Sequence, residues 1–141
     1  FDGPTPPDAV ARVAGLLHEL GCYEVSLGET LGRGRPEAGG AMLEVVTGAV
    51  PADRLAGHFH DTSGGAFDNI DVALDHGVRV FDASVGGLGG CPYAPGAAGN
   101  VATEAVDAHL KALGSETGLD ADRLAASGEI ARRLRTDEGA G

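Results

Sequence analysis

The sequence contains few aromatic residues and few cysteines, and it lacks any long apolar run. Aromatic side chains make up 4% of the 141 residues, with no tryptophan, and the two cysteines are Cys22 and Cys91. Two cysteines cannot form the dense disulfide scaffold of a small secreted domain, which favours reduced thiols and a cytoplasmic location. No run approaches the ~18 apolar residues that a membrane-spanning helix needs, so we expect no membrane segment.

Positive charge is also scarce. Ten Lys and Arg stand against 21 Asp and Glu, which gives a formal net charge of −11. Proteins that bind nucleic acids or anionic membranes present a basic surface. The charge balance therefore argues against both kinds of partner.

Glycine, by contrast, is abundant. The chain has 24 glycines in 141 residues, well above the usual share of about 7%. They are not spaced as in collagen, and with 43% hydrophobic residues the chain has enough apolar content for a folded core. Six of the glycines fall within residues 86–99, which predicts a long, conformationally permissive loop there.

Hydrophobic periodicity and turn residues predict alternating helices and strands. Helices are expected at residues 5–20, 36–49, 66–76, 101–113 and 124–134, and strands at 22–27, 55–60 and 78–85. Strands that start near residues 22, 54 and 78 have the spacing of βα units in a parallel sheet.

Three such strands are too few for a complete (β/α)8 TIM barrel, which takes about 250 residues. We therefore predict an α/β fold in which residues 1–136 form the C-terminal portion of such a barrel, about three βα units plus terminal helices. The alternative is a small three-layer α/β domain. Residues 137–141 have no strongly apolar side chain and are expected to be a frayed tail.

His58 and His60 lie at the end of the second predicted strand. Residues i and i+2 of a strand point to the same side, so the two imidazoles should lie together. The carboxyl ends of barrel strands are where active sites occur, and two imidazoles can bind a divalent metal. The alternative is a chance HxH pair in an ordinary strand.

The glycine-rich segment at residues 86–100 follows the third predicted strand. Such a loop could serve as a lid over a ligand, with Cys91 at its centre as a nucleophile or an acid–base group. The alternative is a linker that carries an inert thiol. The glycines that we assign to the lid are Gly87, Gly89 and Gly90.

Other polar residues follow the predicted strands or start the next helix. Asn100 could be either an N-cap or an oxygen ligand for a metal, and Glu104 either a solvated first-turn acid or a site residue. Glu29 follows the first strand, where we expect it to face the same rim as the histidines. Ser26, Asp82 and Ser84 end strands at that rim, and the convergence of three strands is stronger evidence for a site than any one motif.

Three segments together resemble the 3-hydroxy-3-methylglutaryl-CoA lyases, which are metal-dependent βα-barrel enzymes. They are GCYEVSLG at residues 21–28, GHFHDT at 57–62 and SVGGLGGCPYAPGAAGN at 84–100, which continues as VATE. The HxHDT segment is shared with related aldolases and synthases, whereas the cysteine loop is more specific to the lyases. The resemblance extends over about residues 4–130.

The resemblance implies that His58, His60 and Asn100 hold Mg²⁺ or Mn²⁺ and that Cys91 is the catalytic thiol. We favour a role for Cys91 as a proton donor to the enolate of acetyl-CoA rather than as a covalent nucleophile. The resemblance also implies catalytic roles for Glu104 and Glu29. Asp61 and Ser84 are assigned to substrate binding.

An acyl-CoA substrate, a role in leucine catabolism and ketone-body formation, and a homodimer of the full-length enzyme are further implications. The chain departs from the family pattern at Glu29, where an Asp is usual, and at Arg33, Arg35, Ser63 and Gly65. It also contains no counterpart of the Asp ligand and the Arg that the family takes from its first strand. We therefore expect the 141 residues to be inactive alone.

The same residues are compatible with other functions. A lyase for a longer-chain 3-hydroxyglutaryl-CoA would carry the same motifs. A Claisen-type synthase or aldolase of the same superfamily would share the histidines, although the synthases lack the Cys-Pro-Tyr loop. A non-catalytic metal-binding α/β fragment is the alternative from a different class.

Overall fold

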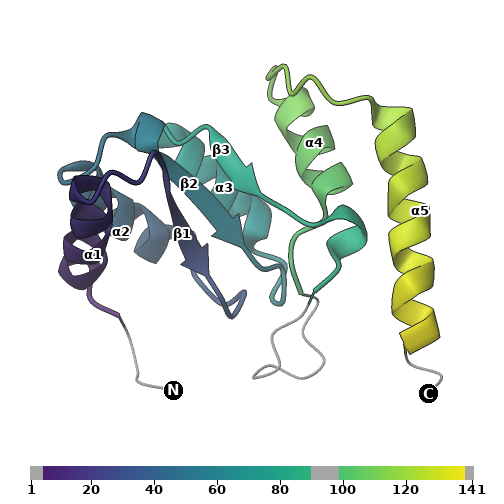
Figure 1. The fold of residues 1–141 in the computed structure, drawn as a ribbon, viewed down its shortest axis with the longest axis horizontal. Helices are drawn as coiled ribbons and strands as arrows, with labels where there is room; N and C mark the ends of the chain where they lie inside the picture. The colour runs from purple at the N-terminus through teal and green to yellow at the C-terminus, as the bar shows by residue number, and fades with distance from the viewer. Residues whose placement is uncertain (1–4, 90–98, 139–141) are drawn as a thin grey trace.

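A computed structural model describes residues 5–89 and 99–138. The helices are α1 (Pro7–Glu19), α2 (Pro36–Thr47), α3 (Ala66–Asp75), α4 (Thr103–Ala112) and α5 (Ala121–Glu138). The strands are β1 (Val25–Glu29), β2 (Leu55–Phe59) and β3 (Val80–Asp82), with short 3-10 turns η1 (Ala52–Arg54) and η2 (Val85–Gly87). Figure 1 shows the alternation of helix and strand that the sequence predicts.

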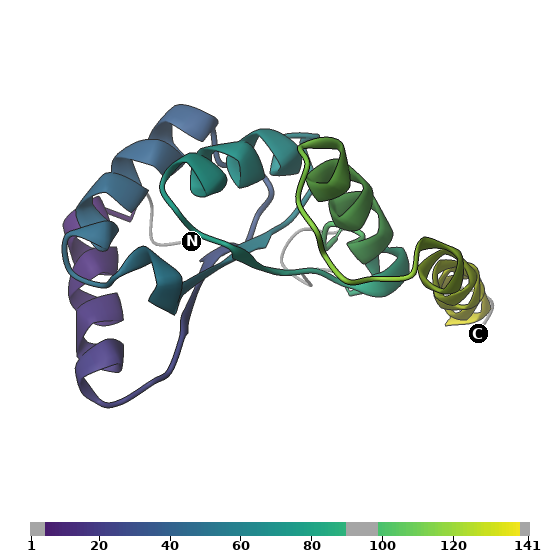
Figure 2. The same ribbon diagram turned by 90° about the horizontal axis from the view of Figure 1, so that it is seen from above.

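The three strands form one parallel sheet in the order β1-β2-β3. Consecutive strands are neighbours because each βα unit returns the chain to the same end of the sheet. Helices α1 to α4 follow an arc along the outer side of the strands, and α5 lies beyond α4 (Figure 2). The α/β architecture that the sequence predicts is confirmed.

The two faces of the sheet differ in chemistry. Apolar residues of the strands pack with α1, α2 and α3 into one core, whose fully buried members include Val46, Val50, Leu55 and Val78. The opposite face carries polar groups, where Ser26 Oγ on β1 donates to Asp82 Oδ2 on β3 at 2.5 Å. His58 belongs to this polar face, since its pairing partners in the register are Gly28 and Asp82.

The observed strands are shorter or shifted relative to the prediction. The first begins at Val25 rather than at residue 22, because Gly21 adopts a positive φ of 92° and the Cys22 amide donates to Leu17 O, which ends helix α1. The third ends at Asp82, and the predicted strand residues after it turn into η2.

Helix α4 begins two residues later than predicted, at Thr103. The preceding residues are extended: Val101 N donates to Phe59 O on β2, and Ala102 bridges to Ser84, which follows β3. Helix α5 is longer than predicted at both ends and continues to Glu138. It therefore includes two residues of the segment predicted to be a frayed tail.

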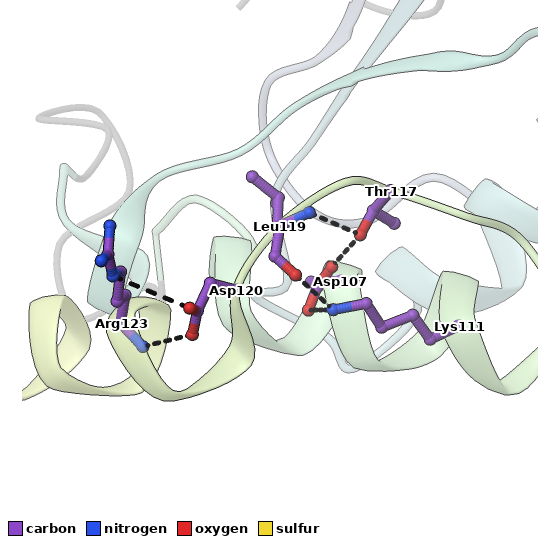
Figure 3. Close-up of polar contacts among 6 residues, drawn as sticks. All are labelled: Asp107, Lys111, Thr117, Leu119, Asp120 and Arg123. Atoms are coloured by element: carbon purple, nitrogen blue, oxygen red, sulfur yellow. Dashed lines mark hydrogen bonds and ion pairs between the residues drawn. The ribbon is translucent and has the colours of Figure 1, made fainter.

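The connection between α4 and α5 is held by a buried carboxylate (Figure 3). Asp107 is 4% exposed and accepts hydrogen bonds from Lys111 Nζ at 2.8 Å and from the Thr117 hydroxyl. Lys111 Nζ also donates to Leu119 O at 2.8 Å. The hydrogen bonds from Lys111 and then from Thr117 lower the pKa of Asp107, so the carboxylate stays ionised.

Across the described ranges, none of the helices has both the length and the apolar character to cross a bilayer.

Candidate active site

The site is built around two imidazoles on the polar face of the sheet. His58 Nε2 and His60 Nε2 lie 3.3 Å apart, and the rings meet edge to face with centroids 5.3 Å apart. The prediction that both point to the same side is therefore confirmed. Two nitrogens at this separation can both reach one cation at about 2.1 Å, the usual metal–imidazole distance.

Asn100 is the third predicted ligand, and the structure brings it beside His60. The two residues form an antiparallel bridge, and Val101 N donates to Phe59 O at 3.2 Å. The side-chain amide donates from Nδ2 to Leu88 O at 2.9 Å. Asn100 thus bridges to His60, the residue that follows β2, rather than capping α4, whose N-cap is Ala102.

Two polar atoms of this group are buried and have no hydrogen-bond partner within the described residues. They are Asn100 Oδ1 and His60 Nδ1. An acceptor oxygen left without a donor is costly in a folded protein, and a bound cation is one way to satisfy it. Two imidazoles with one amide oxygen therefore fit a divalent cation.

This ligand set leaves room for further groups. No cluster of three or more His, Cys, Asp and Glu that could hold a metal occurs in residues 5–89 and 99–138. The candidate ligands are two imidazoles and one amide, from His58, His60 and Asn100. Mg²⁺ and Mn²⁺ take about six ligands and prefer oxygen. A complete site would need additional ligands such as carboxylates or water.

Glycines at the two ends of the glycine-rich segment 86–100 allow a close approach of the backbone. Gly99 has a φ of 82°, and a Cβ there would lie 2.1 Å from Gly89 O. A Cβ on Gly89, at a φ of 86°, would lie 2.8 Å from Asn100 Nδ2. A side chain at Gly89 would therefore displace the Asn100 amide, and one at Gly99 would displace the backbone of Gly89. Gly87 also has a positive φ, of 62°, which favours glycine there. Gly90 and Cys91 lie outside the described residues.

Glu104 uses both of its carboxylate oxygens within the protein. Oε2 accepts from Gly86 N at 3.0 Å, and Oε1 accepts from Arg132 Nη1 on α5 at 3.2 Å. Arg132 also donates to Glu129 Oε1 at 2.7 Å, a bond that raises the pKa of Arg132 and keeps it a cation. This geometry favours a positioning role for Glu104 over contact with a substrate.

The expectation that Glu29 faces the same rim as the histidines is wrong. Glu29 pairs with Phe59 in the register, whereas His58 pairs with Gly28, so the side chains of Glu29 and His58 lie on opposite faces. Glu29 Oε1 accepts from Arg33 N at 3.2 Å. Its carboxylate supports the loop after β1, and the structure does not bring it to the histidines.

Asp61 and Ser84, both predicted to bind substrate, hold the ends of neighbouring segments together. Asp61 Oδ1 accepts from Ala66 N at 3.2 Å at the start of α3, and Asp61 N donates to Gly99 O at 3.1 Å. Ser84 binds Val101 and Thr103 through its backbone. Both residues border the histidine and asparagine group, so substrate contact stays a prediction for them.

A cavity of about 540 Å³ lies elsewhere, between α1, α2 and the apolar face of the sheet. Its lining is mostly apolar and includes Val13, Leu17 and Met42, with Glu29 among the polar residues, but neither histidine. This cavity is therefore separate from the candidate metal site.

Sequence patterns did not single out two groups that support the site. Leu88 acts through its carbonyl oxygen, which a side-chain motif cannot indicate. Arg132 lies 28 residues from Glu104 in the chain, in a helix with many charged residues, so only the fold shows which of them approaches the loop.

Comparisons with known proteins agree with these motifs. The HMGL-like family profile matches residues 2–130. The hydroxymethylglutaryl-CoA lyase of Pseudomonas mevalonii is 54% identical over 137 residues, which is 96% of this chain and 46% of that protein. The 3-hydroxy-3-isohexenylglutaryl-CoA/hydroxy-methylglutaryl-CoA lyase of Pseudomonas aeruginosa is 52% identical over 92% of this chain and 43% of its own length.

Comparison with solved structures also matches the chain to an HMG-CoA lyase. The crystal structure of the HMG-CoA lyase from Brucella melitensis superposes with a TM-score of 0.94 at 59% identity, over 96% of this chain and 48% of that one. This chain spans about half the length of these relatives. The family match covers nearly all of the sequence, and the chain therefore belongs to the HMGL-like family.

Proposed function

We propose that this chain supplies the histidine, asparagine and cysteine part of a lyase that cleaves 3-hydroxy-3-methylglutaryl-CoA into acetyl-CoA and acetoacetate. The observation that carries the proposal is the His58–His60 pair, with Nε2 atoms 3.3 Å apart, beside an Asn100 Oδ1 that is buried without a donor in the described residues. The enzymatic names of the relatives supply the substrate class.

His58, His60 and Asn100 would hold Mg²⁺ or Mn²⁺. When bound, such a cation lowers the pKa of a hydroxyl group that it contacts and orients the substrate. Leu88 O fixes the Asn100 amide by accepting from Nδ2, so that the other end of the amide, Oδ1, is the one left to face a cation. In the tautomer of His60 that can bind a cation through Nε2, Nε2 is unprotonated and Nδ1 carries the proton.

The reaction needs a base and an acid. A base removes the proton of the tertiary hydroxyl, the C–C bond breaks, and the electron pair passes to the carbon that becomes the enolate of acetyl-CoA. We assign to Cys91 the return of a proton to that carbon, which a thiol with a pKa near ~8.5 can perform when water is excluded.

A longer-chain substrate is the second candidate. The relative from Pseudomonas aeruginosa is named for both an isohexenyl and a methyl substrate, at 52% identity. Ser63 and Gly65 lie in the loop after β2 and are small. Smaller side chains near the site would leave more room for an extended acyl chain.

The test is an activity assay of the full-length protein. Acetoacetate and acetyl-CoA would be measured with Mg²⁺ or Mn²⁺, after chelation, and with the isohexenyl analogue in place of the methyl substrate. We expect metal-dependent release of both products, lost in a Cys91→Ser variant that still binds metal. Metal-independent turnover, or no turnover with either substrate, would overturn the proposal.

Two further features belong to the same proposal. We expect a homodimer of the full-length enzyme located in the cytoplasm, and an assay of the 141-residue chain alone to show no turnover. Acetoacetate release by that chain would show that its own residues suffice for catalysis.

A further inference from the structure

One polar chain of contacts runs from helix α5 to the segment that holds Asn100. Arg132 Nη1 donates to Glu104 Oε1 at 3.2 Å, and Gly86 N donates to Glu104 Oε2 at 3.0 Å. Glu104 therefore joins three elements, namely α4, α5 and the turn η2. Glu104 is partly buried, with 22% of its side chain exposed, so solvent screens these bonds less than it would at an open surface.

The turn η2 connects this network to the candidate metal ligand. Leu88 N donates to Val85 O at 3.3 Å, which closes the turn around Gly86. Leu88 O then accepts from Asn100 Nδ2 at 2.9 Å. The orientation of the Asn100 amide therefore depends on where the turn lies.

Helix α5 approaches the turn through residues with little or no side chain. A Cβ on Gly86, whose φ is 65°, would lie 2.8 Å from Ala131 Cβ. A Cβ on Gly128 would lie 2.6 Å from Glu104 Oε1 and 3.1 Å from its Cδ. The absence of a side chain at Gly128 leaves the space in which the Glu104 carboxylate meets Arg132.

From these contacts we infer that Arg132 and Gly128 are positioning residues for metal binding: they hold Glu104 on η2 and thereby set the Asn100 amide toward the cation. The inference rests on the proposed function, since it assumes that Asn100 is a ligand. It adds to that function a dependence of the metal site on α5, a helix that supplies no predicted ligand.

The first test measures the affinity of the full-length protein for Mn²⁺ alone, by electron paramagnetic resonance of the free ion and without substrate. Arg132→Met removes the donor but keeps an unbranched apolar stem. We expect it to weaken Mn²⁺ binding by about 10-fold, as for other residues that orient a metal ligand. Arg132→Lys keeps a cation within reach of Glu104, and an intermediate affinity is expected.

Arg123→Met is the matched control on the same helix. Arg123 is 90% exposed, and its Nε lies 3.7 Å from Asp120 Oδ2, away from Glu104. Its loss should leave Mn²⁺ affinity unchanged. An equal weakening in both methionine variants would show a nonspecific effect of charge on α5 and would overturn the inference.

Gly128→Ala separates positioning from stability. Alanine favours a helix over glycine, so the melting temperature of the metal-free protein should rise or stay the same. The added Cβ should nevertheless displace the Glu104 carboxylate and weaken Mn²⁺ binding. A merely structural role would move both readouts in the same direction, which would contradict the inference.

The outcomes also distinguish the two proposals. If the wild type binds no Mn²⁺ and releases no acetoacetate, the proposed function fails and this inference fails with it. If the wild type binds Mn²⁺ and turns over while Arg132→Met and Gly128→Ala bind it equally well, only the inference is overturned.

Discussion

The contacts that stabilise one end of the molecule differ in kind from those that stabilise the other. Helices α1 to α3 pack on the sheet through an apolar core in which Val46, Leu55 and Val78 are at most 1% exposed. Helix α5, at the other end (Figure 1), buries only glycine and alanine positions within its described part and exposes Ile130 and Leu134. Its contacts with the turn η2 and with Glu104 are polar or involve small residues.

Because of this difference, we expect one end to contribute mainly to stability and the other mainly to the geometry of the site. Burial of large apolar side chains contributes most of the free energy of unfolding, so the sheet and α1 to α3 should dominate stability. Exposed ion pairs contribute little stability but can fix geometry. The α4–α5 end should therefore affect the site more than it affects the free energy of unfolding.

The largest stability effect is expected at Ile70, which is 0% exposed in the packing between α3 and α4. Ile70→Ala should lower the free energy of unfolding by about 2–5 kcal/mol, since it removes buried methyl groups and leaves a cavity. Urea unfolding of the purified protein measures this. Ile130→Ala, at a position that is 61% exposed, is the control with an expected change below ~0.5 kcal/mol. Equal losses of unfolding free energy in the two variants would contradict the view that the apolar core dominates stability.

Loss of a histidine should affect the metal site more than any positioning residue does. His60→Ala removes one of two imidazoles whose Nε2 atoms are 3.3 Å apart. We expect Mn²⁺ affinity to fall by more than the ~10–100-fold typical of supporting residues. Titration of the full-length protein with Mn²⁺ checks this, with His76→Ala, at the C-cap of α3, as the control. Unchanged affinity in His60→Ala would exclude the site.

Asp107 makes the α4–α5 connection dependent on pH. Its pKa is lowered in the fold by Lys111 and then by Thr117. A lowered pKa stabilises the fold above the ordinary aspartate range, near pH 4, and that contribution is lost as the pH falls through the folded-state pKa. Asp107→Asn should therefore lower the melting temperature at pH 7 and reduce its further decrease between pH 5 and pH 2. An identical pH dependence in both proteins would contradict the assignment.

The smallest effect is expected for the exposed pair of Arg123 and Asp120. Its two side chains are 90% and 59% exposed, where water and salt screen the attraction. Arg123→Met should change the free energy of unfolding by less than ~0.5 kcal/mol. Thermal melts at low and high salt measure this change. A loss of unfolding free energy as large as that of Ile70→Ala would show that this ion pair fixes α5 in place.

The regular part of the fold could be predicted from the sequence because its signals are local. Helical spacing of apolar residues and the intervals between strands indicate βα units, and the i, i+2 spacing of His58 and His60 places them together. The error at Glu29 has the same local origin. Side chains alternate along a strand, so a position one residue past Gly28 lies on the opposite face from His58.

The supports of the site could not be predicted, because they are made by contacts between distant residues. The Asn100 amide is held by a backbone carbonyl, and Glu104 is held by an arginine 28 residues away. Several arginines in α5 are equivalent in the sequence. Only the packing of Gly86 against α5 determines which of them reaches the turn.

The most direct test of the central claim is anomalous diffraction at the manganese edge from crystals of the full-length protein grown with Mn²⁺. The account predicts one strong peak about 2.1 Å from His58 Nε2 and His60 Nε2 and at a similar distance from Asn100 Oδ1. A peak bound to other residues, or a peak that contacts the histidines with the Asn100 amide turned away, would contradict it.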